Sequence, residues 1–265
     1  MQANTVSIRR GVTWALEGFT LLRRAPVPLI MIGMLYLCAL FLTMVVPLLG
    51  QLLPLFLTPV LSVGLMHGAR LVDSNRIPPV GTLYAVLLSG LRNIESRRRN
   101  GLLALGMINV VAVVGAMYCS RLADGGIFFD LLSGQLSAQD PKLKDPSLGW
   151  GALVFGLLYM PSQMALWYAP ALTAWEGITP LKSLFFSFIA VMRNKAAFLG
   201  YGAAWLAAIM IISIALQLLF LLIGGSGLTV MALISPLLFS AVYCSFWPSY
   251  RDVFAVAAPT PAPAS

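Results

Sequence analysis

The feature that most restricts the fold is the run of residues 25–69, which contains no charged side chain. A transmembrane helix needs about 20 consecutive apolar residues to cross roughly 30 Å of hydrocarbon. A run of 45 residues is long enough for two such helices, and Gly50 and Gln51 mark the place where the chain can reverse. The run therefore predicts a pair of transmembrane helices at 27–49 and 52–69.

Four more stretches have the same character, at 101–120, 151–175, 197–223 and 228–250. Charged residues make up 10% of the chain, against about 25% in an ordinary soluble domain. These stretches are too long and continuous for the alternating strands of a membrane barrel, and helices satisfy their own backbone in lipid. We expect an all-α polytopic membrane protein with six transmembrane helices in one membrane domain, 1–254. The Ala- and Pro-rich tail, 255–265, should be disordered.

The placement of the cations decides between nucleic acid and membrane as the partner. The chain has 17 Lys and Arg against 9 Asp and Glu, an excess that a nucleic-acid-binding protein would place on one soluble face. Here fourteen of the 17 lie before the first span, between spans 2 and 3, between spans 4 and 5, and after the last span. Cytoplasmic loops of membrane proteins retain Lys and Arg. We therefore expect both termini in the cytoplasm and no nucleic-acid partner.

Three groups of cations stand directly beside a predicted span. Such residues bind anionic lipid headgroups, each worth about 1 kcal/mol near the membrane surface. We therefore expect membrane lipids as partners and leave a membrane-protein partner open. These interfacial basic anchors are Arg23, Arg24, Arg97, Arg98, Arg99, Arg193 and Lys195.

Each group of cations ends a segment whose apolar residues recur at helical spacing, which predicts three amphipathic helices on the cytoplasmic interface. A surface helix followed by two spans then occurs three times, which suggests three parallel repeats. The alternative is a six-helix protein with ordinary basic loops and no repeat. The predicted apolar faces are Ile8, Val12, Ala15, Phe19 and Leu22; Leu83, Leu87, Leu91 and Ile94; and Leu181, Leu184, Phe188 and Met192.

Several segments resemble a family of uncharacterised proteobacterial inner-membrane proteins. The similar segments are WALEGFTLLRRAP (14–26), APALTAWEGITPLKSLFFSF (169–188), RNKAAFLGYG (193–202) and YRDVF (250–254). More remotely, the layout is similar to the membrane domain attached to some glycerophosphodiester phosphodiesterases. The resemblance covers most of the chain up to Phe254. It implies a six-helix fold in a bacterial inner membrane, and it carries no catalytic residue to this sequence.

The sequence offers no constellation for catalysis or for a metal or cofactor. No ionisable residue lies near the middle of a span, and acid–base or nucleophilic catalysis needs a positioned titratable group. An enzymatic role would have to come from Glu176, Asp73 or His67 near the cytoplasmic face. Cys38, Cys119 and Cys244 stand singly, so we expect no metal site, no cofactor and no enzyme.

The uncharged polar residues inside the spans form the remaining candidate site, an intramembrane polar cluster of Asn109, Gln163 and Gln217. Such groups usually form hydrogen bonds between helices. Alternatively, Pro161 and Pro170 break the span at 151–175 and open a cavity between spans 3, 4 and 5.

Two functions remain at this point. The first is a non-enzymatic membrane protein that acts by interaction, assembly or lipid organisation, and the alternative is a transporter or lipid-handling channel.

Overall fold

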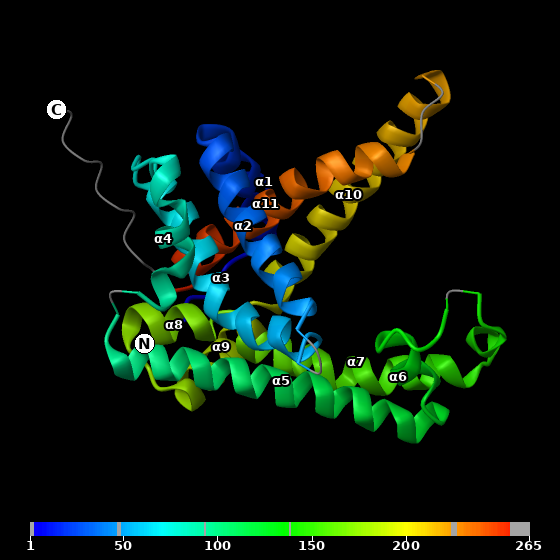
Figure 1. Cartoon of the computed structure of the whole chain (residues 1–265). Coiled ribbons are helices and arrows are strands. Elements are labelled where there is room, and N and C mark those ends of the chain that lie inside the picture. Colours follow the sequence, from blue (N-terminus) through cyan, green and yellow to red (C-terminus); the bar gives the residue numbers. More distant parts are fainter. Residues whose placement is uncertain (1–2, 47–48, 93, 138, 224–226, 255–265) are drawn as a thin grey trace.

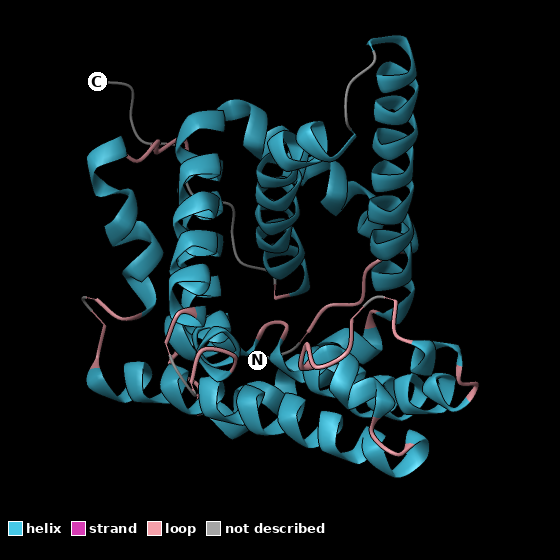
Figure 2. Cartoon of the chain, turned by 45° about the vertical axis from the view of Figure 1, so that its right-hand side comes forward, coloured by secondary structure: helices cyan, strands magenta, loops and turns pink. Residues whose placement is uncertain are grey.

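The computed structural model describes residues 3–46, 49–92, 94–137, 139–223 and 227–254, with the side chains of 219–223 and 227–233 left aside. Within these residues every regular element is a helix (Figure 2). The predicted all-α class is therefore confirmed. The tail at 255–265, expected to be disordered, lies outside the described residues.

Five segments of the described chain are long and apolar enough to cross a membrane, which supports a polytopic protein. They begin and end close to the predicted spans, although most extend further at one end. The five segments are α2 (Pro26–Met44), α3 (Leu52–Asp73), α5 (Ser96–Asp124), α7 with α8 (Ser147–Leu166 and Ala169–Glu176) and most of α10 (Lys195–Ile223).

The sixth predicted span, 228–250, falls within helix α11 (Gly227–Val253). The side chains of its first turns lie outside the described part of the chain. As a membrane span it remains a prediction.

The remaining described helices are shorter than the candidate spans. The predicted surface helix before span 3 is shorter than expected, because α4 ends at Leu87 and α5 begins only at Ser96. Residues 97–99 therefore belong to the transmembrane helix. The shorter helices are α1 (Ile8–Arg24), η1 (Val80–Thr82), α4 (Leu83–Leu87), η2 (Leu88–Gly90), α6 (Ile127–Leu132), η3 (Pro141–Lys144) and α9 (Pro180–Arg193).

The span at 151–175 is broken near Pro170, as predicted, but not at Pro161. Helix α7 runs through Pro161, and the break comes later, at Trp167 and Tyr168, just before Pro170. At the break the Ser187 hydroxyl of α9 accepts a hydrogen bond from the Tyr168 N–H at 2.9 Å and donates one to the Met164 carbonyl at 2.9 Å. Ser187 thus replaces the missing i→i−4 bond, which is why a broken helix is stable here.

The short helices pack against the helix pair that precedes them in the chain. Helix α4 lies against α2 and α3, and α9 lies against α7 and α8. Helix α1 has no preceding pair, and it packs against α10 and α11 at the other end of the sequence (Figure 1). Each of these three shorter helices therefore packs against a different group of long helices, and the contact of α1 with α10 and α11 closes the arrangement into a ring.

Helices α1 and α9 both leave large apolar residues exposed on one side, so the predicted faces are only partly right. In α9, Ser183 and Ser187 are fully buried, whereas 75% of Leu181 and 61% of Phe185 are exposed. The reason is close packing, since α1 reaches α10 through Gly11, where a Cβ would overlap the carbonyl of Ala197. The buried face of α1 consists of Gly11, Trp14, Ala15, Gly18, Leu21 and Leu22.

The largest core lies where α1, α8, α10 and the end of α11 meet. Trp14, Tyr168, Trp247 and Tyr250 are all fully buried there. Ring pairs such as Tyr168 and Phe254, 5.3 Å apart and edge to face, extend the contact. Contacts of this kind stabilise beyond the area that they bury.

Replacing Gly11 tests the close contact between α1 and α10. Gly11→Ala should destabilise the protein by about 1 to 3 kcal/mol, because the new methyl group meets backbone atoms that cannot move independently. Thermal unfolding in mild detergent measures the change. Gly115→Ala is the matched control, because no described atom of another helix lies within 4 Å of the position of its Cβ. This substitution should stabilise α5 by roughly 0.5 to 1 kcal/mol, because glycine loses more conformational freedom than alanine in a helix. Equal melting temperatures for the two variants would contradict the contact.

Candidate functional site

Two of the three predicted intramembrane polar residues lie in contact. The Gln163 side-chain amide of α7 donates to the Asn109 Oδ1 atom of α5 at 3.3 Å, and the Asn109 amide donates to the Leu55 carbonyl of α3 at 2.7 Å. That carbonyl has no helical partner, because Pro59 stands four residues later and lacks an N–H. The Asn109 amide therefore supplies the hydrogen bond that the Leu55 carbonyl lacks because of Pro59.

The third residue is elsewhere. Gln217 is exposed on α10. Asn109 and Gln163 line a cavity of about 270 Å³, here called the polar cavity, and none of its lining residues comes from α10. It lies between α3, α5, α7, α8 and α11, which corrects the expected position between spans 3, 4 and 5. Its other lining residues include Thr58, Pro59, Ser62, Met66, Tyr159 and Tyr243.

The basic anchors stay apart at different helix ends, and one of them differs from the rest. Arg98 is partly buried and donates to the carbonyls of Ala174 and Trp175, at 3.2 and 3.0 Å, at the end of α8. It also lies against Gly177, whose φ of +67° ends that helix. Arg98 thus links the start of α5 to the end of α8. The exposed anchors are Arg23, Arg24, Arg97, Arg99, Arg193 and Lys195.

A group of ionisable residues joins α1, α3 and α11, and the sequence reasoning had named only Asp73 among them. This charge cluster consists of Arg10, Glu17, Asp73, Arg251 and Asp252. Arg251 lies at its centre, 2.8 Å from Glu17, 3.0 Å from Asp73 and 3.4 Å from Asp252. Glu17, Arg251 and Asp252 fall within the segments that carry the family resemblance, which was the available signal.

Two tryptophans complete the cluster. The indole N–H of Trp14 donates to Asp252 at 2.8 Å, and that of Trp247 donates to Asp73 at 2.8 Å. Burial alone would raise the pKa of Asp252, but the hydrogen bonds from Arg10 and Trp14 outweigh it, and the pKa lies below its ordinary value. The hydrogen bond to Asp252 likewise raises the pKa of Arg10. Arg10 and Asp252 are therefore held in their charged forms.

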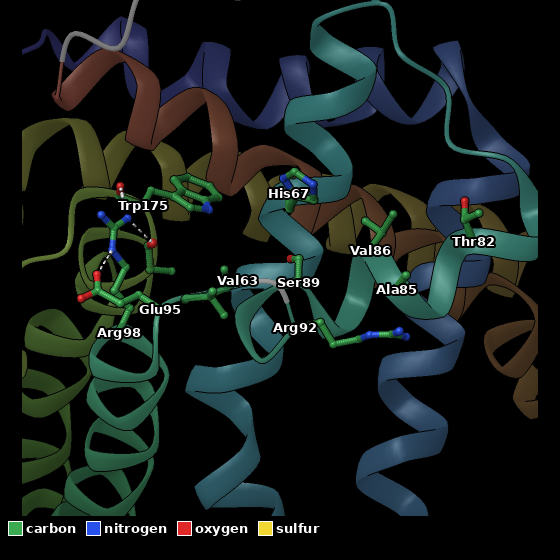
Figure 3. Close-up of a pocket in the computed structure, with 12 residues that line it drawn as sticks. Val63, His67, Thr82, Ala85, Val86, Ser89, Arg92, Glu95, Arg98 and Trp175 are labelled. Carbon is green, nitrogen blue, oxygen red and sulfur yellow. Dashed lines mark hydrogen bonds and ion pairs between the residues drawn. The ribbon is translucent and has the colours of Figure 1, made fainter.

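A second cavity lies between α3, α4, the start of α5 and the end of α8, and has a volume of about 670 Å³. We call it the interface cavity. Figure 3 shows Arg98 with Glu95 and Trp175 at one end and Thr82 at the other. His67 lines it too. The Ser89 hydroxyl is buried here without a hydrogen-bond partner among the described residues.

Three aspartates of the long connection at 121–149 accept hydrogen bonds from backbone N–H groups. Asp124 accepts hydrogen bonds from the N–H groups of Gly126 and Phe128, at 2.9 and 2.7 Å, before α6. Asp140 and Asp145 accept similar bonds from Lys142 and Ser147. In the part of the chain that is described, no group of three or more His, Cys, Asp or Glu residues could hold a metal ion.

Removing the Asn109 amide tests its part in the helix at Pro59. Asn109→Leu should cost about 1 to 2 kcal/mol, because the Leu55 carbonyl then lacks a partner. Gln217→Leu is the control and should leave stability unchanged, since Gln217 is exposed. Unfolding in detergent compares the two, and an unchanged Asn109→Leu variant would show that the carbonyl needs no donor.

Acid should weaken the charge cluster through Asp252. Because its pKa is lower in the folded protein, its contribution to stability is present above the unfolded value of 3.8 and is lost as the pH falls through the lower folded value. Asp252→Asn should therefore melt at a lower temperature at neutral pH, and the difference should shrink below pH 3.8. Melting curves across pH measure this, and a constant difference would contradict it.

One curated protein is similar along nearly the whole chain. A probable inner membrane protein of Burkholderia thailandensis is 35% identical over 264 residues, which cover 98% of this chain and 96% of that protein. No protein-family model and no solved structure matches the chain. Similarity of this extent confirms the predicted family and a multi-pass inner-membrane location. The chain belongs to this family of probable inner membrane proteins.

Proposed function

We propose that the protein is a non-enzymatic inner-membrane protein that organises anionic lipid around its cytoplasmic face. The observation that carries this proposal is the outward row on α9. Leu181, Phe185, Ile189 and Met192 are exposed, and exposed Arg193 follows directly. A helix with an exposed apolar row and flanking cations lies in the headgroup region of a bilayer.

Helix α1 has the same character at the other end of the chain. Ile8, Val12 and Leu16 are exposed on one side, and Arg23 and Arg24 follow at its end. Much of each row is exposed, and the buried residues of both helices lie on other faces, such as Gly11 and Trp14 in α1 and Ser183 and Ser187 in α9. Lipid is the apolar medium that covers such rows in a membrane protein.

The orientation and the repeats belong to the same proposal. The distribution of Lys and Arg favours cytoplasmic termini, and a reporter fused at Gln135 should be found outside the cytoplasm; a cytoplasmic reporter would reverse the orientation. The ring in which α4, α9 and α1 each pack on another helix pair supports three parallel repeats.

The absence of an enzymatic role is also proposed. The carboxylates of Glu17, Asp73 and Asp252 are all bound by arginines. Glu176 accepts a hydrogen bond from the Tyr250 hydroxyl at 3.3 Å. Groups held in this way have a structural use that needs no substrate.

Lipid selectivity tests the proposed function. With the protein in bilayers of phosphatidylcholine and a trace of spin-labelled lipid, electron paramagnetic resonance measures how much label is immobilised at the protein surface. Labelled phosphatidylglycerol should be immobilised several-fold more than labelled phosphatidylcholine. Arg193→Gln with Lys195→Gln should reduce this preference, because each cation contributes about 1 kcal/mol near the surface. Lys142→Gln with Lys144→Gln, in the connection on the opposite side, is the matched control.

A wild-type protein without preference for phosphatidylglycerol would overturn the proposal. An equal loss in the control pair would also overturn it, because the selectivity would then come from net charge and not from the cytoplasmic helices.

A transporter is the alternative, and the polar cavity is the observation that supports it. Two of its original reasons are gone, since Gln217 lies elsewhere and α7 continues through Pro161. The alternative would gain support if Ser62→Cys, in a chain without its native cysteines, were labelled by impermeant thiol reagents from both sides of the membrane.

A further inference from the structure

The interface cavity has one cation that the protein leaves uncompensated. Arg98 is engaged by two backbone carbonyls and by Glu95 at 3.7 Å. Arg92 has no acidic partner in the described part of the chain, and its guanidinium rests on the ring of Tyr84, 5.4 Å from the centroid. A guanidinium held over an aromatic ring can still present N–H groups in the fork that matches a phosphate.

The cavity also holds a polar group that lacks a partner. The Ser89 hydroxyl oxygen is buried and makes no hydrogen bond among the described residues. Buried polar atoms in folded proteins are nearly always paired, and exceptions call for a reason. A ligand oxygen in the cavity would provide the missing partner.

The start of α5 adds a favourable field for an anion. Glu95 precedes this helix and lines the cavity, but its side chain does not cap the first turn. The first N–H groups of a helix are unpaired and carry partial positive charge, which attracts phosphate. Ser89, Arg92 and Glu95, which directly precedes α5, thus line the same cavity from one stretch of the chain.

Part of the remaining wall of the cavity is apolar. Val63 comes from α3, Val86 from α4, and Trp175 from the end of α8 (Figure 3). A site for a free phosphate needs no such wall, whereas the glycerol and upper methylene groups of a lipid do. The cavity of about 670 Å³ is within the range of roughly 300 to 1,000 Å³ for small-molecule sites.

The other charged cavity serves as a comparison. The cavity beside the charge cluster is lined by Arg24 and Arg251 but also by Glu17 and Asp73, so its charges balance. Its arginines already bind these carboxylates. The interface cavity is different because Arg92 and the Ser89 hydroxyl have no such partners.

We propose that the interface cavity is a specific site for the phosphate headgroup of one anionic phospholipid. Arg92 binds the phosphate oxygens, and the Ser89 hydroxyl donates a hydrogen bond to the headgroup. This inference rests on the proposed lipid function and makes it specific, because it assigns one bound lipid to a defined cavity in addition to the lipids around the protein.

Native mass spectrometry of the full-length protein in mild detergent tests the site, with phosphatidylglycerol as the added probe. Wild-type protein should retain one phosphatidylglycerol more tightly than the rest. Arg92→Gln should weaken that first binding at least about tenfold, and Ser89→Ala should weaken it several-fold. Arg97→Gln, an exposed arginine outside the cavity, is the matched control and should bind as wild type does.

Soluble competitors distinguish the sources of the phosphate. Inorganic phosphate and glycerol phosphate should fail to displace the lipid at millimolar concentrations, because they do not contact the apolar wall. Displacement by either of them would overturn the lipid assignment and make the cavity a site for a soluble phosphate.

Two further results would overturn the site itself. Equal weakening by Arg92→Gln and Arg97→Gln would mean attraction by surface charge, and unchanged binding in Arg92→Gln would mean that the cavity is not used. In both cases the proposed function would stand if the spin-label preference persisted. Because Arg92 is exposed and Ser89 has no partner, thermal unfolding should show that both variants fold, with Ser89→Ala no less stable than wild type without lipid.

Discussion

The arrangement of this protein depends on the contact of α1, α3 and α11 around Arg251. Inside a bilayer, apolar side chains gain little by leaving lipid for protein, so helices need polar contacts or close backbone packing to associate. Arg251 supplies the polar contact by binding Glu17, Asp73 and Asp252. The indole groups of Trp14 and Trp247 extend it into the aromatic core. The first and last helices of the chain are thereby fixed to one another.

Side chains from neighbouring helices repair the breaks in the long helices. Asn109 satisfies the carbonyl that Pro59 leaves free, and Ser187 bridges the interruption between α7 and α8. A free backbone group in hydrocarbon is costly, so each repair stabilises the fold and links two helices. Polar residues that resemble a transport path in the sequence thus have a structural use.

The presence or absence of partners within the protein distinguishes the two proposed kinds of lipid contact. In the proposed function, the outward rows of α1 and α9 face lipid in general, because other faces of these helices make the protein contacts. The interface cavity offers instead a cation without an acidic partner and a hydroxyl without a hydrogen-bond partner among the described residues. General lipid organisation and one specific lipid are therefore compatible, and different residues carry them.

The sequence by itself determined the helical class and five of the membrane segments, because hydrocarbon length and the lack of charge act locally along the chain. Its resemblance to known proteins indicated the family. It also identified Asn109 and Gln163 as polar residues in the membrane. Only the tertiary structure decided which faces of α1 and α9 are buried, that Gln217 lies apart, and that Arg10, Asp73 and Arg251 meet. These features depend on contacts between residues as far as 242 positions apart, and such contacts leave no periodic trace in the sequence.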